Sequence, residues 1–63
     1  MQLIDFLGLY HGDAKICLVD TRKEIVFTGD IFDAMISEYR YSKVFSFSFH
    51  NAMLFIKVEK IYD

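Results

Sequence analysis

The side chains best suited to chemistry in this chain are one cysteine, two histidines and scattered carboxylates. A nucleophilic thiol needs a base within hydrogen-bond reach and a cationic or helix N-terminal setting that stabilises the thiolate. Cys17 lies instead in an apolar stretch, and no spacing pairs it with His11 or His50. We therefore expect Cys17 to be a small hydrophobe on a strand, and we expect the protein not to be an enzyme.

A metal or cofactor site is not indicated either. Zinc sites repeat Cys and His at short, regular spacings, and His11, Asp13, Cys17 and His50 show no such spacing. The three glycines fit no phosphate-binding loop. The sequence therefore predicts neither a bound metal nor a cofactor.

The charge balance argues against general nucleic-acid binding. The chain has a net charge of −2, whereas nucleic-acid binders cluster Lys and Arg. Residues 1–38 hold three bases and seven acids, and residues 39–63 hold four bases and two acids. "YRYSK" at residues 39–43 mixes aromatic and basic groups, but cations are favoured at a helix C-terminus in any case. A modestly dipolar surface fits protein–protein steering better.

A chain of 63 residues forms one small domain at most, so residues 1–63 are taken as one domain. Its 54% hydrophobic content is more than a small core needs, which leaves apolar surface for a partner. The single cysteine suits a reducing cytoplasm. The N-terminus lacks the features of a signal peptide, and no apolar run approaches the roughly 18 residues of a membrane helix.

Two segments have the apolar periodicity of helices. Residues 1–12 are expected to form a helix that ends at Gly12, and residues 30–40 a helix with Asp30 as N-cap and Asp33 in its first turn. The apolar positions are Leu3, Ile4, Leu7 and Tyr10 in the first segment, and Ile31, Met35 and Tyr39, with Phe32 and Ile36 alongside, in the second.

Two other segments, residues 14–29 and 43–62, are typical of β-hairpins. Turns centred on residues 22–23 and 51–52 set the register. The expected pairs are Val19–Val26, Leu18–Phe27 and Cys17–Thr28 in the first hairpin. In the second they are Phe49–Leu54, Phe47–Ile56 and Phe45–Val58 on one face, and His50–Met53, Ser48–Phe55 and Ser46–Lys57 on the other.

The stretch "VFSFSFH" at residues 44–50 places Phe45, Phe47 and Phe49 on one face of a strand. Such rings form either a core face or a platform on which bases stack. All three meet aliphatic partners in the expected register, and a stacking platform needs a basic surround that is missing here. We therefore expect the Phe face to be core, covered by the helices.

The expected fold is a two-layer α+β domain in the order α-β-β-α-β-β, with four antiparallel strands and two helices on one face. The strand order stays open. Phe55, Met53, Val26 and Val19 then fall on the outer face of the sheet, where they form either a partner-binding patch or ordinary apolar scatter. The acidic residues Asp30, Asp33 and Glu38 are a second candidate, since they suit a basic partner surface.

The order of these features resembles small phage and prophage proteins of Gram-positive bacteria. The matching pieces are "LIDFLGLYHGD", "KICLVD", "IVFTGDI" and "VFSFSFHNAMLFIKV". The resemblance implies a mobile-element origin and, by analogy with small phage proteins, binding to a bacterial host protein, as in inhibitors of host defence such as anti-CRISPR proteins. The group has no catalytic motif to carry over.

The expected function is therefore that of a non-catalytic module that binds and blocks a bacterial host protein in the host cytoplasm. Two alternatives stay open: a small homodimeric structural or regulatory protein, and a weak nucleic-acid binder.

Overall fold

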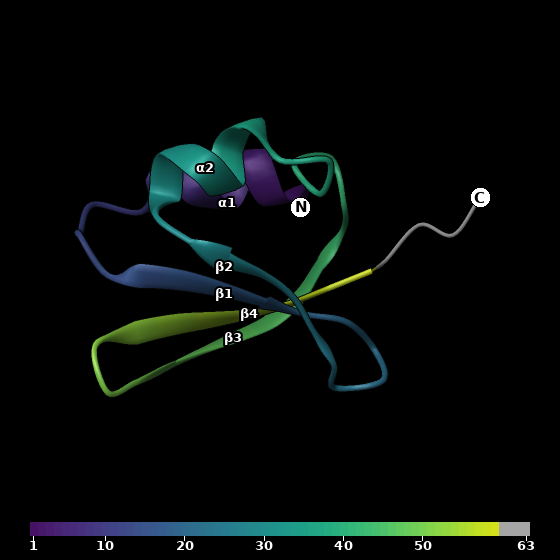
Figure 1. Cartoon of the computed structure of the whole chain (residues 1–63). Helices are drawn as coiled ribbons and strands as arrows, with labels where there is room; N and C mark the ends of the chain where they lie inside the picture. Colours follow the sequence, from purple (N-terminus) through teal and green to yellow (C-terminus); the bar gives the residue numbers. More distant parts are fainter. Residues whose placement is uncertain (60–63) are drawn as a thin grey trace.

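A computed structural model describes residues 1–59 of the chain. The elements follow the expected order, with α1 at Leu3–Leu9, β1 at Lys15–Val19, β2 at Ile25–Gly29, α2 at Ile31–Ile36, β3 at Val44–His50 and β4 at Met53–Val58. The strands form one sheet in the order β2-β1-β4-β3. Both helices lie on the same side of this sheet (Figure 1), so the two-layer α+β architecture is confirmed.

The sheet is mixed, and the expectation of a wholly antiparallel sheet was wrong. Each hairpin is antiparallel, but β1 and β4 pair in parallel and join the two hairpins at the centre of the sheet. Within the sheet, these two strands carry the fully buried aliphatic side chains, including Leu18 and Ile56. A central strand has a neighbouring strand on each side and the helices above it, so its side chains lose the most solvent-accessible surface on folding. The two most apolar strands therefore gain the most hydrophobic stabilisation at the centre of the sheet.

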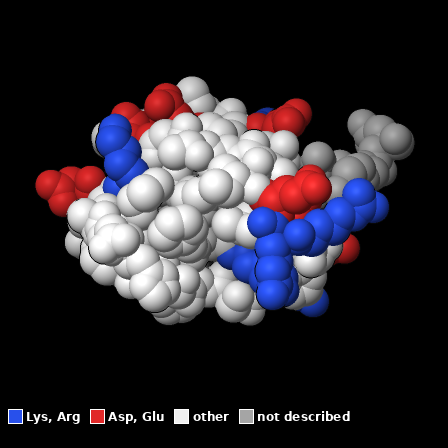
Figure 2. Space-filling model, turned by 60° about the horizontal axis from the view of Figure 1, so that its bottom comes forward, with Lys and Arg blue, Asp and Glu red and all other residues white. Residues whose placement is uncertain are grey.

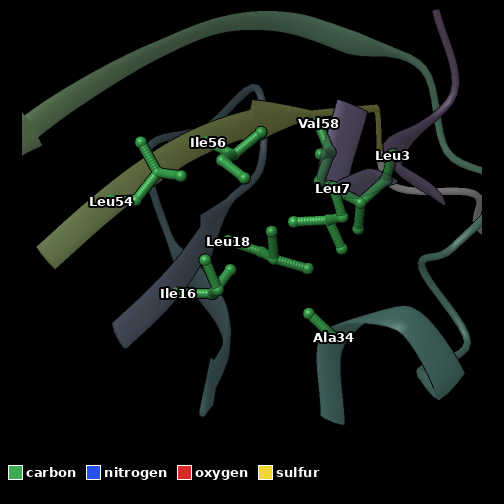
Figure 3. Close-up of a cluster of buried hydrophobic side chains, with 8 residues drawn as sticks. All are labelled: Leu3, Leu7, Ile16, Leu18, Ala34, Leu54, Ile56 and Val58. Carbon is green, nitrogen blue, oxygen red and sulfur yellow. The ribbon is translucent and has the colours of Figure 1, made fainter. Parts of the chain in front are cut away.

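The core lies between the centre of the sheet and the helices (Figure 3). Side chains from β1, β4, α1 and α2 point toward one another in a single cluster, formed by Leu3, Leu7, Ile16, Leu18, Ala34, Leu54, Ile56 and Val58. Alternate residues of β4 are buried, which is the two-residue period of a strand with one covered face.

Both helices are shorter than the sequence predicted. The N-cap of α2 is confirmed, since Oδ1 of Asp30 accepts a hydrogen bond of 2.9 Å from the backbone N–H of Asp33. Ser37 ends this helix by donating its hydroxyl to the carbonyl of Ala34, and Phe32 and Ile36 project from it into solvent. Gly12 does not stop α1 in the left-handed conformation: no glycine among residues 1–59 has a positive φ, and α1 ends before it, at Leu9.

The register of the first hairpin is confirmed at two of its three expected pairs. Leu18 lies opposite Phe27 and Cys17 opposite Thr28. A bulge then shifts the ladder, so that Val19 pairs with Ile25 rather than with Val26. Bulges of this kind insert one residue into one strand, which a symmetric count from the turn does not reveal.

Asp20 closes this hairpin and is fully buried. Its Oδ1 accepts hydrogen bonds from the backbone N–H groups of Arg22, at 2.8 Å, and Glu24, at 3.0 Å. Its main chain is bonded at both ends as well, since its N–H donates to Glu24 and its carbonyl accepts from Lys23. The carboxylate thus fixes a turn in which Lys23 has a positive φ.

The second hairpin has the expected turn, in which Asn51 and Ala52 both have positive φ, as a type I′ turn requires. The pairs Phe49–Leu54 and Phe47–Ile56 are confirmed, and so are the three pairs of the opposite face. At the far end Val44, not Phe45, lies opposite Val58, because a bulge interrupts β3 at Phe45. Residues 60–62, which the sequence assigned to this hairpin, lie outside the described residues.

The Phe face is not core, which corrects a central expectation. Phe45, Phe47 and Phe49 lie on the helix side of the sheet, but they are 47%, 63% and 57% exposed. Their strand β3 is at the edge of the sheet. Helix α2 packs against β1 and β2, and α1 packs against α2, so two helices of this length leave the edge strand uncovered.

The exposure of β3 predicts different costs for substitutions on β4 and β3. Ile56→Ala empties a buried site on a central strand and should lower the free energy of unfolding by about 2–5 kcal/mol. Phe47→Ala should cost only about 1 kcal/mol, because it removes one exposed ring that contacts Phe6. Urea denaturation of both variants measures the difference. Equal losses would mean that β3 is covered after all.

The turn at Asp20 gives a second test. Asp20→Ala removes the acceptor of two backbone N–H groups and should lower the free energy of unfolding by about 1–3 kcal/mol. Asp20→Asn keeps an oxygen at that place and should lose less. If thermal and urea unfolding rank the two variants in the opposite order, the side-chain hydrogen bonds do not hold the turn.

Candidate protein-binding surfaces

An apolar groove of about 660 Å³ lies between α1 and β3. We call it the aromatic groove; its lining consists of Met1, Phe6, Leu9, Tyr10, Val44, Phe45, Ser46 and Phe47. Four of these residues are among the large apolar side chains that the fold leaves exposed: Met1, Leu9, Phe45 and Phe47. The groove therefore gathers on one side of the molecule rings and aliphatic chains that contribute little to the core.

The groove is built by the docking of the N-terminus along the start of β3. The backbone N–H of Val44 donates to the carbonyl of Met1 at 2.9 Å, and that of Leu3 donates to Ser42 at 2.8 Å. These bonds start α1 beside β3. Phe6, on the side of α1 that faces the strand, then brings its ring centroid within 5.1 Å of that of Phe47, at an interplanar angle of 53°, a tilted arrangement that aromatic pairs favour.

The chemistry of the groove is that of apolar contact. None of its lining side chains is charged, so these side chains offer no acid, base or anion-binding group. A cation beside the groove is Lys43, whose Nζ lies 5.5 Å from the centroid of the Phe45 ring. One lysine beside the rings is less than the basic surround that a stacking platform for bases needs. The groove suits the apolar side chains of a protein.

The predicted outer patch exists in part. Val19, Met53 and Phe55 lie on the sheet face away from the helices, since their neighbours in sequence point into the core. The ring of Phe55 is half-buried on this face, between Cys17 of β1 and Ser48 of β3. Figure 2 shows the centre of the visible surface free of Lys, Arg, Asp and Glu, with charged groups around its rim. This face nevertheless mixes apolar and polar side chains, since Ser48 lies opposite Phe55 and Ser46 opposite Lys57, and it has a small hollow whose lining includes Val19, Phe55 and Lys57.

Val26 does not extend this patch. It is half-buried and packs against the core cluster. The residue that lies beside Val19 in β2 is Ile25, which is 64% exposed. Sequence reasoning missed Ile25 because the bulge between the two strands moves it to a place where regular alternation would put Val26.

The acidic candidates do not join the sheet patch. Asp30, Asp33 and Glu38 are exposed and lie on or beside α2, in the helical layer on the opposite side of the sheet from Phe55 (Figure 1). Asp30 already serves as the helix cap. The residues that the sequence singled out therefore belong to two separate surfaces.

The remaining chemical candidates differ in their exposure to solvent. Cys17 is buried, while His11 and His50 are exposed. Within residues 1–59, no three His, Cys, Asp or Glu side chains gather in a way that would hold a metal ion. No helix in the same range is long and apolar enough to cross a membrane.

The sequence did not predict the aromatic groove, although one of its patterns indicates a second contact surface on the first helix. Phe6 and Leu9 are apolar and three residues apart, on a side of the first helix that Leu3 and Leu7 do not occupy. A second apolar side on a short helix indicates a second contact surface. Without the strand order, nothing showed that this side faces the exposed rings of β3.

Comparison of the chain with models of protein families, with curated proteins and with solved structures gave no match. Function is therefore inferred from the surfaces of the chain itself.

The burial of Cys17 leads to a test of its role. The thiol is 1% exposed on a central strand, so a thiol reagent should label it only when the sheet opens. Labelling in native buffer should be far slower than in 6 M guanidinium chloride. Labelling at the rate of a free cysteine in the folded protein would restore the possibility of a reactive thiol.

Proposed function

We propose that the chain is a non-catalytic protein-binding module whose partner docks in the aromatic groove. The observation that carries this proposal is the convergence of exposed Met1, Leu9, Phe45 and Phe47 on one uncharged groove. Contiguous exposed apolar surface on a small protein marks an interaction site. Aromatic anchors in a groove are also the residues that most often dominate the energy of protein interfaces.

The energetics favour the groove over the outer sheet face. A side chain that is about half exposed or more gains little from folding, whereas a partner that covers it removes most of that apolar area from water, at about 25 cal/mol per Å². Phe45 and Phe47 are in that condition, while Phe55 already lies half-buried against the sheet. The larger gain on binding is therefore at the groove.

The proposed partner is a bacterial host protein that presents apolar side chains, and the module acts by covering the surface on which that protein depends. The resemblance to small phage and prophage proteins supports this choice, with inhibition of a host defence system in the bacterial cytoplasm as the specific role. The lack of charged residues in the groove supports a protein partner over a nucleic acid.

Substitutions at exposed positions test the groove without disturbing the core. Phe45→Ser and Leu9→Ser each remove an exposed apolar side chain from the lining and should keep the wild-type circular dichroism spectrum. Either change should weaken the complex with a partner captured from bacterial lysate by about thirtyfold, the effect of losing an interface anchor of about 2 kcal/mol.

Phe32→Ser is the matched control, because Phe32 is 75% exposed on α2 and does not line the groove. Isothermal titration of each variant with the purified partner gives the affinities. An equal loss for Phe32→Ser, or no loss for Phe45→Ser and Leu9→Ser, would contradict the proposal.

The outer sheet face is tested in the same titration. Phe55→Ser should leave partner affinity within about threefold of wild type, because the groove lies on the other side of the sheet. A loss at Phe55→Ser in a protein that remains folded, together with wild-type binding by Phe45→Ser, would move the binding site to the patch that the sequence first indicated.

A further inference from the structure

The outer edge of β3 is unprotected along most of its length. β3 is an outer strand of the sheet, and its residues 44–50 contain no proline and no Lys, Arg, Asp or Glu. Natural sheets guard such edges with charges, prolines, bulges or covering segments. In β3 such protection is present only at the start of the strand, where the carbonyl of Met1 accepts a hydrogen bond from Val44 and a bulge interrupts the strand at Phe45. Residues 46–50 remain open.

The hairpin turn determines which backbone groups face this open edge. Asn51 and Ala52 form the turn, so His50 and Met53 are the pair that the turn hydrogen bond closes. In an antiparallel ladder, hydrogen-bonded and non-hydrogen-bonded residues alternate. The main chains of His50 and Ser48 are therefore directed to β4, and those of Phe47 and Phe49 are directed outward.

We propose that β3 pairs antiparallel with β3 of a second copy of this chain, about a two-fold axis at Ser48. Phe47 of each copy then lies opposite Phe49 of the other, and each such pair exchanges both N–H···O=C bonds. Ser48 lies opposite its own copy, and Ser46 lies opposite His50. The sheet of each copy continues into that of the other across this axis.

The alternation of the sequence supports a second copy as the occupant. Around Ser48 the strand reads Phe-Ser-Phe, so the two-fold pairing sets ring beside ring on one face and hydroxyl beside hydroxyl on the other. A shift of one residue would set rings against hydroxyls. The contact is the same for both copies, so it closes at two and leaves no free β3 edge.

This inference goes beyond the proposed function, because it stands on the backbone edge of β3, although Phe47 belongs both to the groove lining and to the proposed contact. Ser48 points to the sheet face opposite the groove, since it lies beside Phe55 in β4. Its exposed side chain can therefore be changed without altering the groove lining.

Charge at Ser48 tests the axis. Sedimentation velocity across micromolar to millimolar concentrations should show a wild-type dimer. Ser48→Lys sets like charges against each other and should raise its Kd about tenfold or more, an effect that salt reduces. Ser48→Glu alone should behave in the same way. A mixture of the two variants should dimerise at least as well as wild type, because opposite charges then meet.

A cysteine at the same position tests the register. Residues in a non-hydrogen-bonded pair have Cα atoms about 4.5 Å apart, within the roughly 4.4–6.8 Å that a disulfide spans. Ser48→Cys should therefore form a disulfide-linked dimer under mild oxidation. Ser46→Cys is the matched control: it is an exposed serine on the same face, but the axis places the two copies of residue 46 about 14 Å apart along the strands, so it should remain monomeric on a non-reducing gel.

A monomeric wild-type protein at millimolar concentration would overturn the inference. So would a dimer that Ser48→Lys does not weaken, or equal cross-linking of the two cysteine variants, since either result places the contact elsewhere. The outcomes for the groove are separate: Phe45→Ser should lose the host partner and keep the dimer, because Phe45 lies outside the open stretch.

Discussion

The parallel pairing of β1 with β4 is the constraint on which the rest of the structure depends. It joins two hairpins that would otherwise be separate, since each alone is a two-stranded ribbon of marginal stability. It also places the five buried aliphatic side chains of the sheet next to one another under the helices: Ile16, Leu18, Leu54, Ile56 and Val58. Because β1 and β4 take the centre, β2 and β3 become the edges, and the exposure of the Phe rings follows from that order.

Much of this fold could be predicted from local patterns. Period-two alternation around Asn51–Ala52 predicts the register of the second hairpin as far as Ser46, and the position of Asp30 before an apolar helix predicts its role as a cap. Local patterns did not tell which strands meet across the sheet. The parallel contact of Cys17 with Phe55 joins distant segments, and the bulges at Val19 and Phe45 depend on strand twist and neighbouring contacts.

The same gap explains why the candidate site was misplaced. Phe47 was assigned to the core because it lies opposite Ile56 and on its face, and both of these observations are correct. Burial, however, also requires a covering layer, and α1 and α2 are too short to extend over the edge strand. The two-residue period of a strand shows which side chains share a face of the sheet. How much of that face is covered depends on the order of the strands in the sheet and on where the helices pack. The part that Phe6 and Leu9 take in the groove follows from the position of α1 beside β3, which the sequence does not reveal.

The pairing of β1 with β4 also constrains how the chain folds. Lys15 meets Met53 and Val19 meets Lys57, so the central ladder joins strands from opposite ends of the sequence. Contacts of such long sequence separation slow folding, because a large loop must close before they form. During synthesis on a ribosome, β1 and its hairpin leave the exit tunnel before β4 does. The core therefore cannot assemble until residues 53–58 have also left the exit tunnel, because β4 supplies half of the central ladder.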